Sequence, residues 1–321
     1  MPETDQTKMD CWPGVVLVPC TDYALQNART AVRQMAAQLP ALSKISAGMR
    51  VAIKVNLVAP LRPDRAATTH PILLQALTEY LLEQGAEVVI GDSPGGLFTK
   101  AYVDGVYTAC GLRTVQQAGA ELNADFSVQT ASFPAAAAAQ AFDYTAWLDR
   151  ADVIVNFSKL KTHGMMSMSC AVKNMFGVIP GLQKPEYHYR YPQVEKFADM
   201  LLDLNAYFRP AVNLVDAVVA MEGNGPTNGR ARHMGVLLGS ETPYTLDLVC
   251  AGLIGLAPDS VPTLVRAAER GLAPASVEEV PLSGGLLDRY MAPDFDLSAA
   301  KNDLTGFVSN RTAIGLSLIH I

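Results

Sequence analysis

Five side chains suited to binding an anion are concentrated in two short segments near the middle of the chain. They are Lys159, Lys161, His163, Lys173 and Asn174. The segment 158–164 comes directly after residues 153–157, whose apolar, β-branched character predicts a buried parallel strand. Ligands of open α/β sheets bind where such strands end. Lysine supplies positive charge and asparagine a neutral donor, so the pattern predicts a site for an anionic ligand.

The alternative is a solvated loop with scattered lysines. The Met and Phe residues between the charges argue against it, because solvated loops seldom carry them. A helix predicted over 167–176 would add free backbone N–H groups if its N-terminus faced the site.

Two earlier predicted strands also end in polar or small residues. The strand over 49–57 carries Lys54 and Asn56, which point to the same side because side chains alternate along a strand. A lysine in so apolar a run either meets a polar or anionic group or extends its stem to the end of the sheet. We therefore expect both residues to be candidates for ligand binding.

The strand over 87–91 leads into a loop that contains Asp92, Ser93 and Gly95. Its glycines would allow a ligand to approach the backbone closely. Asp92 would position a metal or a substrate hydroxyl, or it would cap the following helix. The loop lacks the Gly-Lys-Ser/Thr of a Walker A motif and the Gly-x-Gly-x-x-Gly fingerprint.

A fourth strand, predicted over 211–221, contains Asp216 and is followed by Glu222 and Asn224. Turn geometry alone would explain the glycines beside these two residues, so their role in binding is the weaker interpretation. We expect all four strand ends to meet along one edge of a parallel sheet.

Two histidines are candidates at this edge. His163 is suited to act as a general acid or base, because an unperturbed imidazole has a pKa of about 6.5. His188 lies in the aromatic segment 187–191, which would either bind the ligand or form a packed lid.

The order of elements predicts an α/β fold: a mainly parallel sheet with helices on both faces, in a single domain. We place this domain at residues 1–272 and a looser extension at 273–315. Residues 316–321 resemble a translated transposon-adapter sequence, so we expect a non-native tail; the alternative is a genuine apolar strand. Further helices are expected over 25–39, 72–84, 100–119, 194–208, 243–256 and 261–272, and further strands over 15–18 and 233–239.

The overall composition narrows the function classes. The formal charge of −6 argues against nucleic acid as the main partner, since such binding requires a basic face. Residues 1–10 lack the apolar core of a signal peptide, and no apolar run approaches the roughly 18 residues of a membrane span. The five cysteines are scattered, which predicts reduced thiols in a cytoplasmic protein without a membrane partner. Nucleophile-elbow and zinc-ligand patterns are missing from the sequence.

Six segments together resemble the family called domain of unknown function 362, over about residues 15–255. They are 51–57 (VAIKVNL), 69–71 (THP), 91–96 (GDSPGG), 159–163 (KLKTH), 172–177 (VKNMFG) and 222–226 (EGNGP). The resemblance implies one α/β domain, often followed by a ferredoxin-like segment with 4Fe–4S clusters, and an activity that is not settled. This chain has no Cys-x-x-Cys-x-x-Cys run. We therefore expect any 4Fe–4S cluster only in a C-terminal segment absent from this chain.

These observations lead to three hypotheses. The first is a redox-linked enzyme that binds a carboxylate- or phosphate-bearing small ligand, with a redox partner as a further expectation. Its catalytic candidates are His163, Lys161 and Asp92, and its binding candidates are Lys54, Asn56, Ser93, Gly95, Lys159, Lys173, Asn174, His188, Glu222 and Asn224. The second is a non-catalytic electron-transfer or scaffold protein whose iron–sulfur segment is missing. The third is a metal-dependent enzyme that uses Asp92, His163 and Asp216.

Overall fold

The structure, a computed structural model, describes residues 12–300. The adapter-like segment 316–321 and the part of the predicted extension beyond residue 300 lie outside the described residues. The main sheet has nine strands, eight of them in the order β11-β1-β10-β9-β7-β2-β3-β4, with β8 paired to β7. The strands are β1 Val15–Pro19, β2 Arg50–Lys54, β3 Glu87–Gly91, β4 Glu121–Leu122, β7 Val153–His163, β8 Ser167–Ser169, β9 Val212–Glu222, β10 Arg230–Ser240 and β11 Leu282–Ser283.

The centre of the sheet is parallel. Strands β9, β7, β2, β3 and β4 pair in parallel, and β11 pairs in parallel with β1. Among the long strands described, only β10 is antiparallel to its neighbours, which are β1 and β9. The C-terminal ends of the other strands, β1, β9, β7, β2 and β3, therefore lie along the same edge of the sheet. Strands β5 Val128–Ser132 and β6 Ala141–Thr145 form a separate antiparallel pair.

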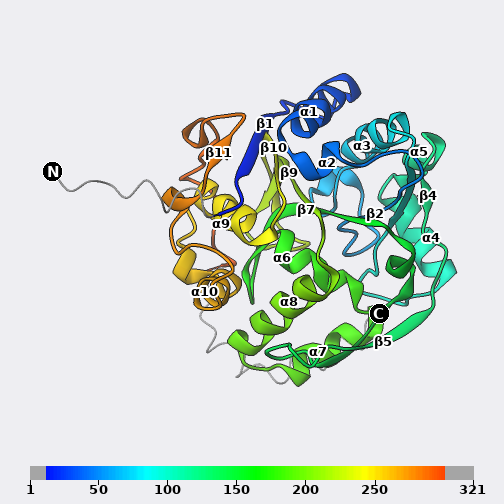
Figure 1. The fold of residues 1–321 in the computed structure, drawn as a ribbon. Coiled ribbons are helices and arrows are strands. Elements are labelled where there is room, and N and C mark those ends of the chain that lie inside the picture. The colour runs from blue at the N-terminus through cyan, green and yellow to red at the C-terminus, as the bar shows by residue number, and fades with distance from the viewer. Residues whose placement is uncertain (1–11, 301–321) are drawn as a thin grey trace.

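Helices cover both faces of this sheet (Figure 1). Consecutive residues of β2 show it: Val51 and Ile53 join the core packed against α1, α3, α4 and α5, whereas Ala52 joins the core packed against α8. The helices are α1 Leu25–Gln38, α2 Pro40–Ser43, α3 Pro71–Glu83, α4 Lys100–Ala109, α5 Leu112–Gln117, α6 Ala171–Asn174, α7 Lys184–Arg190, α8 Val194–Phe208, α9 Pro243–Leu253 and α10 Pro262–Glu269. The predicted α/β class, with a mainly parallel sheet and helices on both faces, is confirmed.

Local sequence explains where several helices begin and end. Helix α3 begins with Pro71, which needs no hydrogen-bond acceptor at the first turn, and His70 Nδ1 accepts the N–H of Ile72. Gly85, with φ of +79°, follows its C-terminus in the left-handed region that glycine adopts readily. Helix α8 has the predicted bounds 194–208, with Pro210 shortly after its end.

One predicted helix is wrong. Residues 167–176 form strand β8, antiparallel to the overhanging end of β7, followed by the four-residue helix α6. Pairing with β7 satisfies the backbone of this segment and overrides its local helical preference. The first N–H groups of α6 are also occupied, because Asp247 accepts those of Ala171 at 2.7 Å and Val172 at 3.1 Å. They are not available to a ligand.

Residues after α10 pack onto the same core. Strand β11 pairs with β1, and Tyr290 and Phe295 are buried beside residues of α9. Short 3-10 helices complete the chain: η2 Pro63–Arg65, η3 Ala146–Arg150, η4 Met175–Val178, η5 Gly181–Gln183, η6 Pro258–Ser260, η7 Val277–Glu279 and η8 Leu287–Tyr290.

Candidate functional site

Lys54 and Asp92 form a buried ion pair at the adjacent ends of β2 and β3. Lys54 Nζ lies 2.9 Å from Asp92 Oδ1, and the two side chains are 1% and 4% exposed. Lys54 Nζ also donates to the carbonyl groups of Val55 and Asn174, and Asp92 Oδ2 accepts the N–H of Leu57. Both groups are therefore occupied by protein partners. Their geometry suits them to hold the strand ends together.

A row of amide side chains crosses the strand ends beside this pair. Asn56 Nδ2 donates to Asn174 Oδ1 at 2.9 Å, and Asn174 Nδ2 donates to Asn156 Oδ1 at 2.7 Å. Asn156 Nδ2 in turn donates to Asn213 Oδ1 at 3.0 Å. Asn156 and Asn213 are not among the residues predicted from the sequence. Each is an amide inside an otherwise apolar strand, and this signal would have identified it.

Lys161 is buried, and none of the described carboxylates forms an ion pair with it. Its Nζ donates to Asn56 Oδ1 at 2.8 Å and to the carbonyl of Ala67 at 2.7 Å, both neutral acceptors. Burial lowers the pKa of Lys161 to about 7, and the positive charges of Lys173 and Lys159 add to this shift. The amine is therefore close to its midpoint of protonation at neutral pH.

Lys173 is half-buried and even less well paired. Its Nζ lies 5.4 Å from the centroid of the Phe176 ring, and no described residue forms a hydrogen bond or ion pair with it. Burial lowers the pKa of Lys173 to about 8. An amine in this position has hydrogen-bond donors free for a ligand.

His163 lies beside these lysines in a defined tautomer. Its Nδ1 accepts the N–H groups of Met165 at 3.1 Å and Met166 at 3.2 Å, so the proton of the neutral ring is on Nε2. Burial, with the charges of Lys173 and Lys161, lowers the pKa of His163 well below its ordinary value. His163 is therefore a neutral hydrogen-bond donor through Nε2 rather than a ready base.

His188 reaches the same region from α7. Its ring stacks on Phe197 with centroids 4.5 Å apart and planes 11° from parallel, and it meets the edge of Phe176. We call Lys161, Lys173, His163 and His188 the lysine–histidine cluster. The cluster places two lysines at the ends of β7 and α6, and no carboxylate among residues 12–300 forms an ion pair with either of them.

The loop after β3 supports the segment that carries α7. Ser93 Oγ accepts the N–H of Gly181 at 2.7 Å, and its carbonyl accepts a bond from Lys184 Nζ at 2.5 Å. Lys184 Nζ also donates to the carbonyl of Ile179, and burial lowers the pKa of Lys184 to about 7. Gly95 is exposed and donates its N–H to the carbonyl of Val58.

Three predicted binding residues have hydrogen-bond partners outside the lysine–histidine cluster. Glu222 bonds to Arg230 and to the N–H of Asp296, so it links β9 to β10 and to the C-terminal segment. Asn224 is exposed, and its carbonyl accepts the N–H of Asn228. The third, Lys159, belongs to a separate network.

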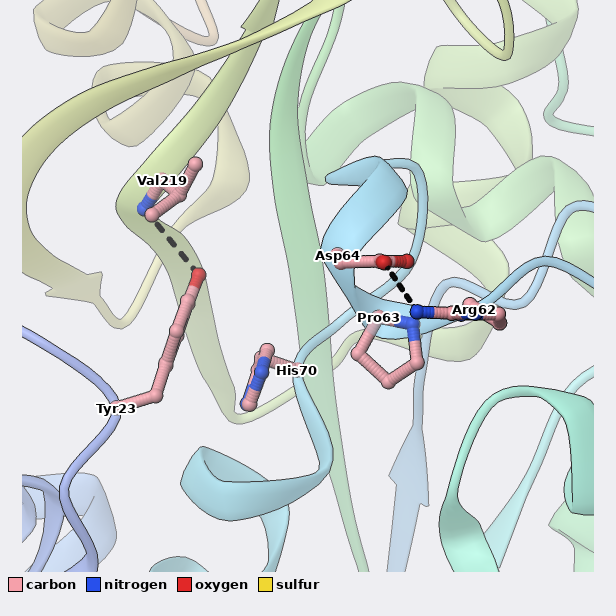
Figure 2. Close-up of a pocket in the computed structure, with 6 residues that line it drawn as sticks. All are labelled: Tyr23, Arg62, Pro63, Asp64, His70 and Val219. Carbon is pink, nitrogen blue, oxygen red and sulfur yellow. Dashed lines mark hydrogen bonds and ion pairs between the residues drawn. The ribbon is translucent and has the colours of Figure 1, made fainter.

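That second network connects the ends of β1, β7 and β9. Lys159 Nζ lies 2.8 Å from Asp216 Oδ2, and both side chains are buried at 1% exposure or less. Tyr23 Oη donates to Asp216 Oδ1 at 2.8 Å and accepts a bond from Lys159 Nζ at 2.8 Å. The ring of His70 stacks on that of Tyr23 with centroids 3.5 Å apart. Beside it lies a cavity of about 470 Å³ (Figure 2).

Tyr23 and His70 were missed as site residues. In the sequence, His70 belongs only to the segment 69–71 of the family resemblance. Tyr23 follows the strand over 15–18, so the strand-end rule, applied to that strand as well, would have found it.

The groups of the metal hypothesis are separated by these networks. Asp92 is paired with Lys54, Asp216 with Lys159 and Tyr23, and His163 with backbone N–H groups. Among residues 12–300, no three His, Cys, Asp or Glu side chains gather closely enough to hold a metal ion. The structure does not bring the three predicted ligands together.

Comparison with known proteins decides the family. The model of the family described as Domain of unknown function (DUF362) matches residues 51–252 of the 321. The chain belongs to this family. The resemblance predicted from the six sequence segments is confirmed.

A curated DUF362 relative is the thylakoid-associated protein sll1697 of Synechocystis sp. (strain ATCC 27184 / PCC 6803 / Kazusa). It is 30% identical over 242 residues, which cover 73% of this chain and 72% of the relative. Within residues 12–300, none of the helices is both long and apolar enough to span a bilayer. The cytoplasmic location stays a prediction, as do the partners.

Among solved structures, the lactate racemase apoprotein from Thermoanaerobacterium thermosaccharolyticum aligns with a TM-score of 0.44 and 12% identity. The alignment covers 72% of this chain and 55% of the racemase chain. At that level of similarity, the activity of the racemase does not transfer to this DUF362 protein.

Proposed function

We propose that this DUF362 protein is an enzyme that binds a small carboxylate- or phosphate-bearing ligand at the lysine–histidine cluster. The observation that carries the proposal is a difference in pairing. Lys54 and Lys159 each have a buried carboxylate within 3 Å, whereas Lys161 and Lys173 have none among the described residues. An anionic ligand would supply the missing partner.

The electrostatic argument follows from burial. Removing an ammonium group from water is unfavourable unless an opposite charge or strong hydrogen bonds compensate it. This is why the pKa values of Lys161 and Lys173 fall to about 7 and about 8. A bound anion would favour the protonated amines and raise both pKa values. Binding would therefore be accompanied by proton uptake above neutral pH.

The same groups are suited to acid–base chemistry on the bound ligand. An amine whose pKa lies near the working pH can both accept and return a proton, so we assign this role to Lys161. His163 would donate a hydrogen bond from Nε2 to an oxygen on which negative charge develops. Asp92 would act through Lys54, by holding the strand end that carries Asn56.

The redox link of the proposal has a different basis. It rests on the family resemblance alone, because ferredoxin-like segments with 4Fe–4S clusters often occur in that family. The cysteines of residues 12–300, namely Cys20, Cys110, Cys170 and Cys250, are free and buried. A scaffold or electron-transfer protein would have no need of free amines with lowered pKa values, which favours the enzyme.

Sulfate binding tests the site, because sulfate keeps a constant double charge across neutral pH. We expect Lys161→Met and Lys173→Met each to weaken sulfate binding about tenfold or more, since each removes a charge-assisted hydrogen bond of about 1.5–3 kcal/mol. Isothermal titration calorimetry in buffers of different ionisation enthalpy would measure the affinity and the proton uptake together. Proton uptake at about pH 8 is the expected result, because Lys161 and Lys173 are partly neutral there.

The matched control is Lys44→Met, which removes an exposed lysine that follows α2. It should leave sulfate affinity and proton uptake unchanged. The proposal fails if the Lys161 and Lys173 variants bind sulfate as the wild type does while remaining folded.

A further inference from the structure

The cavity beside Tyr23 and His70 differs in character from the lysine–histidine cluster. At about 470 Å³ it has the size of a small-molecule site. It is lined by Tyr23, Arg62, Pro63, Asp64, His70 and Val219. We infer that it binds an uncharged planar ring with adjacent hydrogen-bond donor and acceptor groups, the class to which heteroaromatic carboxamides and nucleobases belong.

The ring geometry favours a flat ligand. The Tyr23 and His70 rings are stacked with planes 5° apart, so Tyr23 covers one face of the imidazole. Figure 2 shows His70 between Tyr23 and the segment of Arg62, Pro63 and Asp64. The other face of His70 is therefore the one presented to the cavity. A planar ring can continue this stack with favourable dispersion and quadrupole contacts.

The stacked pair is rigid before any ligand arrives. Tyr23 Oη is bonded to Asp216, to Lys159 and, at 3.2 Å, to the N–H of Val219. The backbone N–H of His70 donates to Asp216 Oδ2 at 3.1 Å. A site already fixed in shape loses little conformational entropy on binding.

The charges around the cavity cancel. Lys159 is paired with Asp216 beneath the rings, and Arg62 is paired with Asp64 at the mouth with N–O 2.6 Å apart. Burial lowers the pKa of His70 to about 4, so its ring is neutral near pH 7. Because these charges are paired, the cavity does not favour a charged ligand, in contrast to the lysine–histidine cluster.

The Arg62–Asp64 pair provides the donor and the acceptor. Its side chains are 78% and 58% exposed, and exposed pairs contribute only about 0–1 kcal/mol. A ligand that offers an oxygen to the guanidinium and an N–H to the carboxylate can replace this pair at little cost. A carboxamide or a nucleobase edge presents both groups side by side.

Nicotinamide is a suitable probe, with cyclohexanecarboxamide as its non-planar counterpart and benzoate as its charged counterpart. Ligand-observed NMR titrations to about 10 mM cover the affinity range of such small ligands. We expect saturable nicotinamide binding that is about tenfold tighter than that of cyclohexanecarboxamide. Benzoate, which the lysine–histidine cluster would bind, should not displace nicotinamide from this cavity. Equal binding of the two carboxamides, displacement by benzoate, or no saturable binding of nicotinamide would overturn the inference.

Two variants locate the binding. Val219→Phe should reduce nicotinamide affinity about tenfold by filling the cavity, and Arg62→Ala, at an exposed position that does not threaten folding, should reduce it severalfold. The control Val128→Phe places the same ring on β5, outside the cavity, and should have no effect. Unchanged affinity in folded Val219→Phe and Arg62→Ala would place the ligand elsewhere and refute the inference.

The same variants separate this inference from the proposed function. Val219→Phe should leave sulfate affinity unchanged, and Lys173→Met should leave nicotinamide affinity unchanged. Loss of nicotinamide binding in Lys173→Met but not in Val219→Phe would assign the ring to the lysine–histidine cluster and contradict the second site.

Discussion

Lys159 and Lys161 lie two residues apart on β7, and both are 1% exposed. Their surroundings are nevertheless opposite. Lys159 meets Asp216 and Tyr23 in a closed network at the β9 side, whereas Lys161 meets an amide oxygen and a carbonyl at the β2 side. The first region has its charges balanced within the protein. The second has an excess of positive charge that a ligand can balance.

This difference separates two uses of a buried lysine. An ion pair such as Lys159–Asp216 positions the elements around it, because separating the charges in a buried environment is strongly unfavourable. Burial lowers the pKa of both lysines, but Asp216 opposes this shift at Lys159, whereas Lys161 has only neutral acceptors and can change its protonation when a ligand binds. Residue type and burial are the same in both regions, so the partner determines the role.

The largest expected effect comes from breaking the balanced region. Asp216→Asn would leave Lys159 buried without a counter-charge, and we expect a loss of about 3–5 kcal/mol in the free energy of unfolding. Urea denaturation followed by circular dichroism would measure it. Replacing both partners, as Lys159→Met with Asp216→Leu, should restore only part of the loss, because Tyr23 Oη and the N–H of His70 would still lack their acceptor. Lys161→Met should lower the free energy of unfolding much less than Asp216→Asn does. A comparable decrease would contradict the proposed difference between a lysine with a carboxylate partner and one without.

A smaller effect is expected at Gly177, which lies against the other ion pair. A Cβ at this position would overlap Asp92 Oδ1 and lie 2.5 Å from Lys54 Nζ. We expect Gly177→Ala to lower the free energy of unfolding by about 1–3 kcal/mol, because both neighbours are buried and cannot move away freely.

Gly105, inside α4, is the matched control for Gly177. A Cβ there meets nothing within 4 Å, so Gly105→Ala should stabilise the helix by up to about 1 kcal/mol. Equal stability changes at the two glycines, measured by thermal denaturation, would contradict the closed packing around Lys54 and Asp92.

The smallest effect is a pH dependence of stability from Lys161. The unfolded chain keeps this proton up to a pKa of about 10.4, whereas the native protein releases it near pH 7. Between these pH values the unfolded state binds more protons than the native state. The free energy of unfolding therefore rises with pH in this range and decreases as the pH falls toward 7. Lys161→Met should reduce the rise in unfolding free energy between pH 7 and 9 by up to about 1 kcal/mol per pH unit.

Urea denaturation at several pH values would measure this slope. Lys173 and Lys184 contribute in the same direction, so part of the slope should persist in the variant. The exposed Lys44→Met variant should retain the wild-type slope. A slope that is identical in Lys161→Met and the wild type would mean that Lys161 keeps its charge in the native state.

Much of the fold could be predicted because the signals are local. The strand over 87–91 and the helix over 194–208 have the predicted bounds, set by apolar periodicity and by neighbouring Gly and Pro. The convergence of Lys54, Asn56 and Asn174 also followed from a general rule about parallel strands. The prediction of a helix over 167–176 was wrong, because the conformation of this segment depends on pairing with the end of β7, and local periodicity does not reveal that pairing.

The sequence by itself determined the α/β class, the DUF362 family and the enrichment of lysines, amides and a histidine at the strand ends. Only the tertiary structure decided which lysine has a carboxylate, because Asp216 reaches Lys159 from a strand 57 residues later and Tyr23 joins them from 193 residues before Asp216. Charge balance in a buried site depends on distances of a few ångströms between such remote segments. Composition and spacing along the chain do not contain those distances.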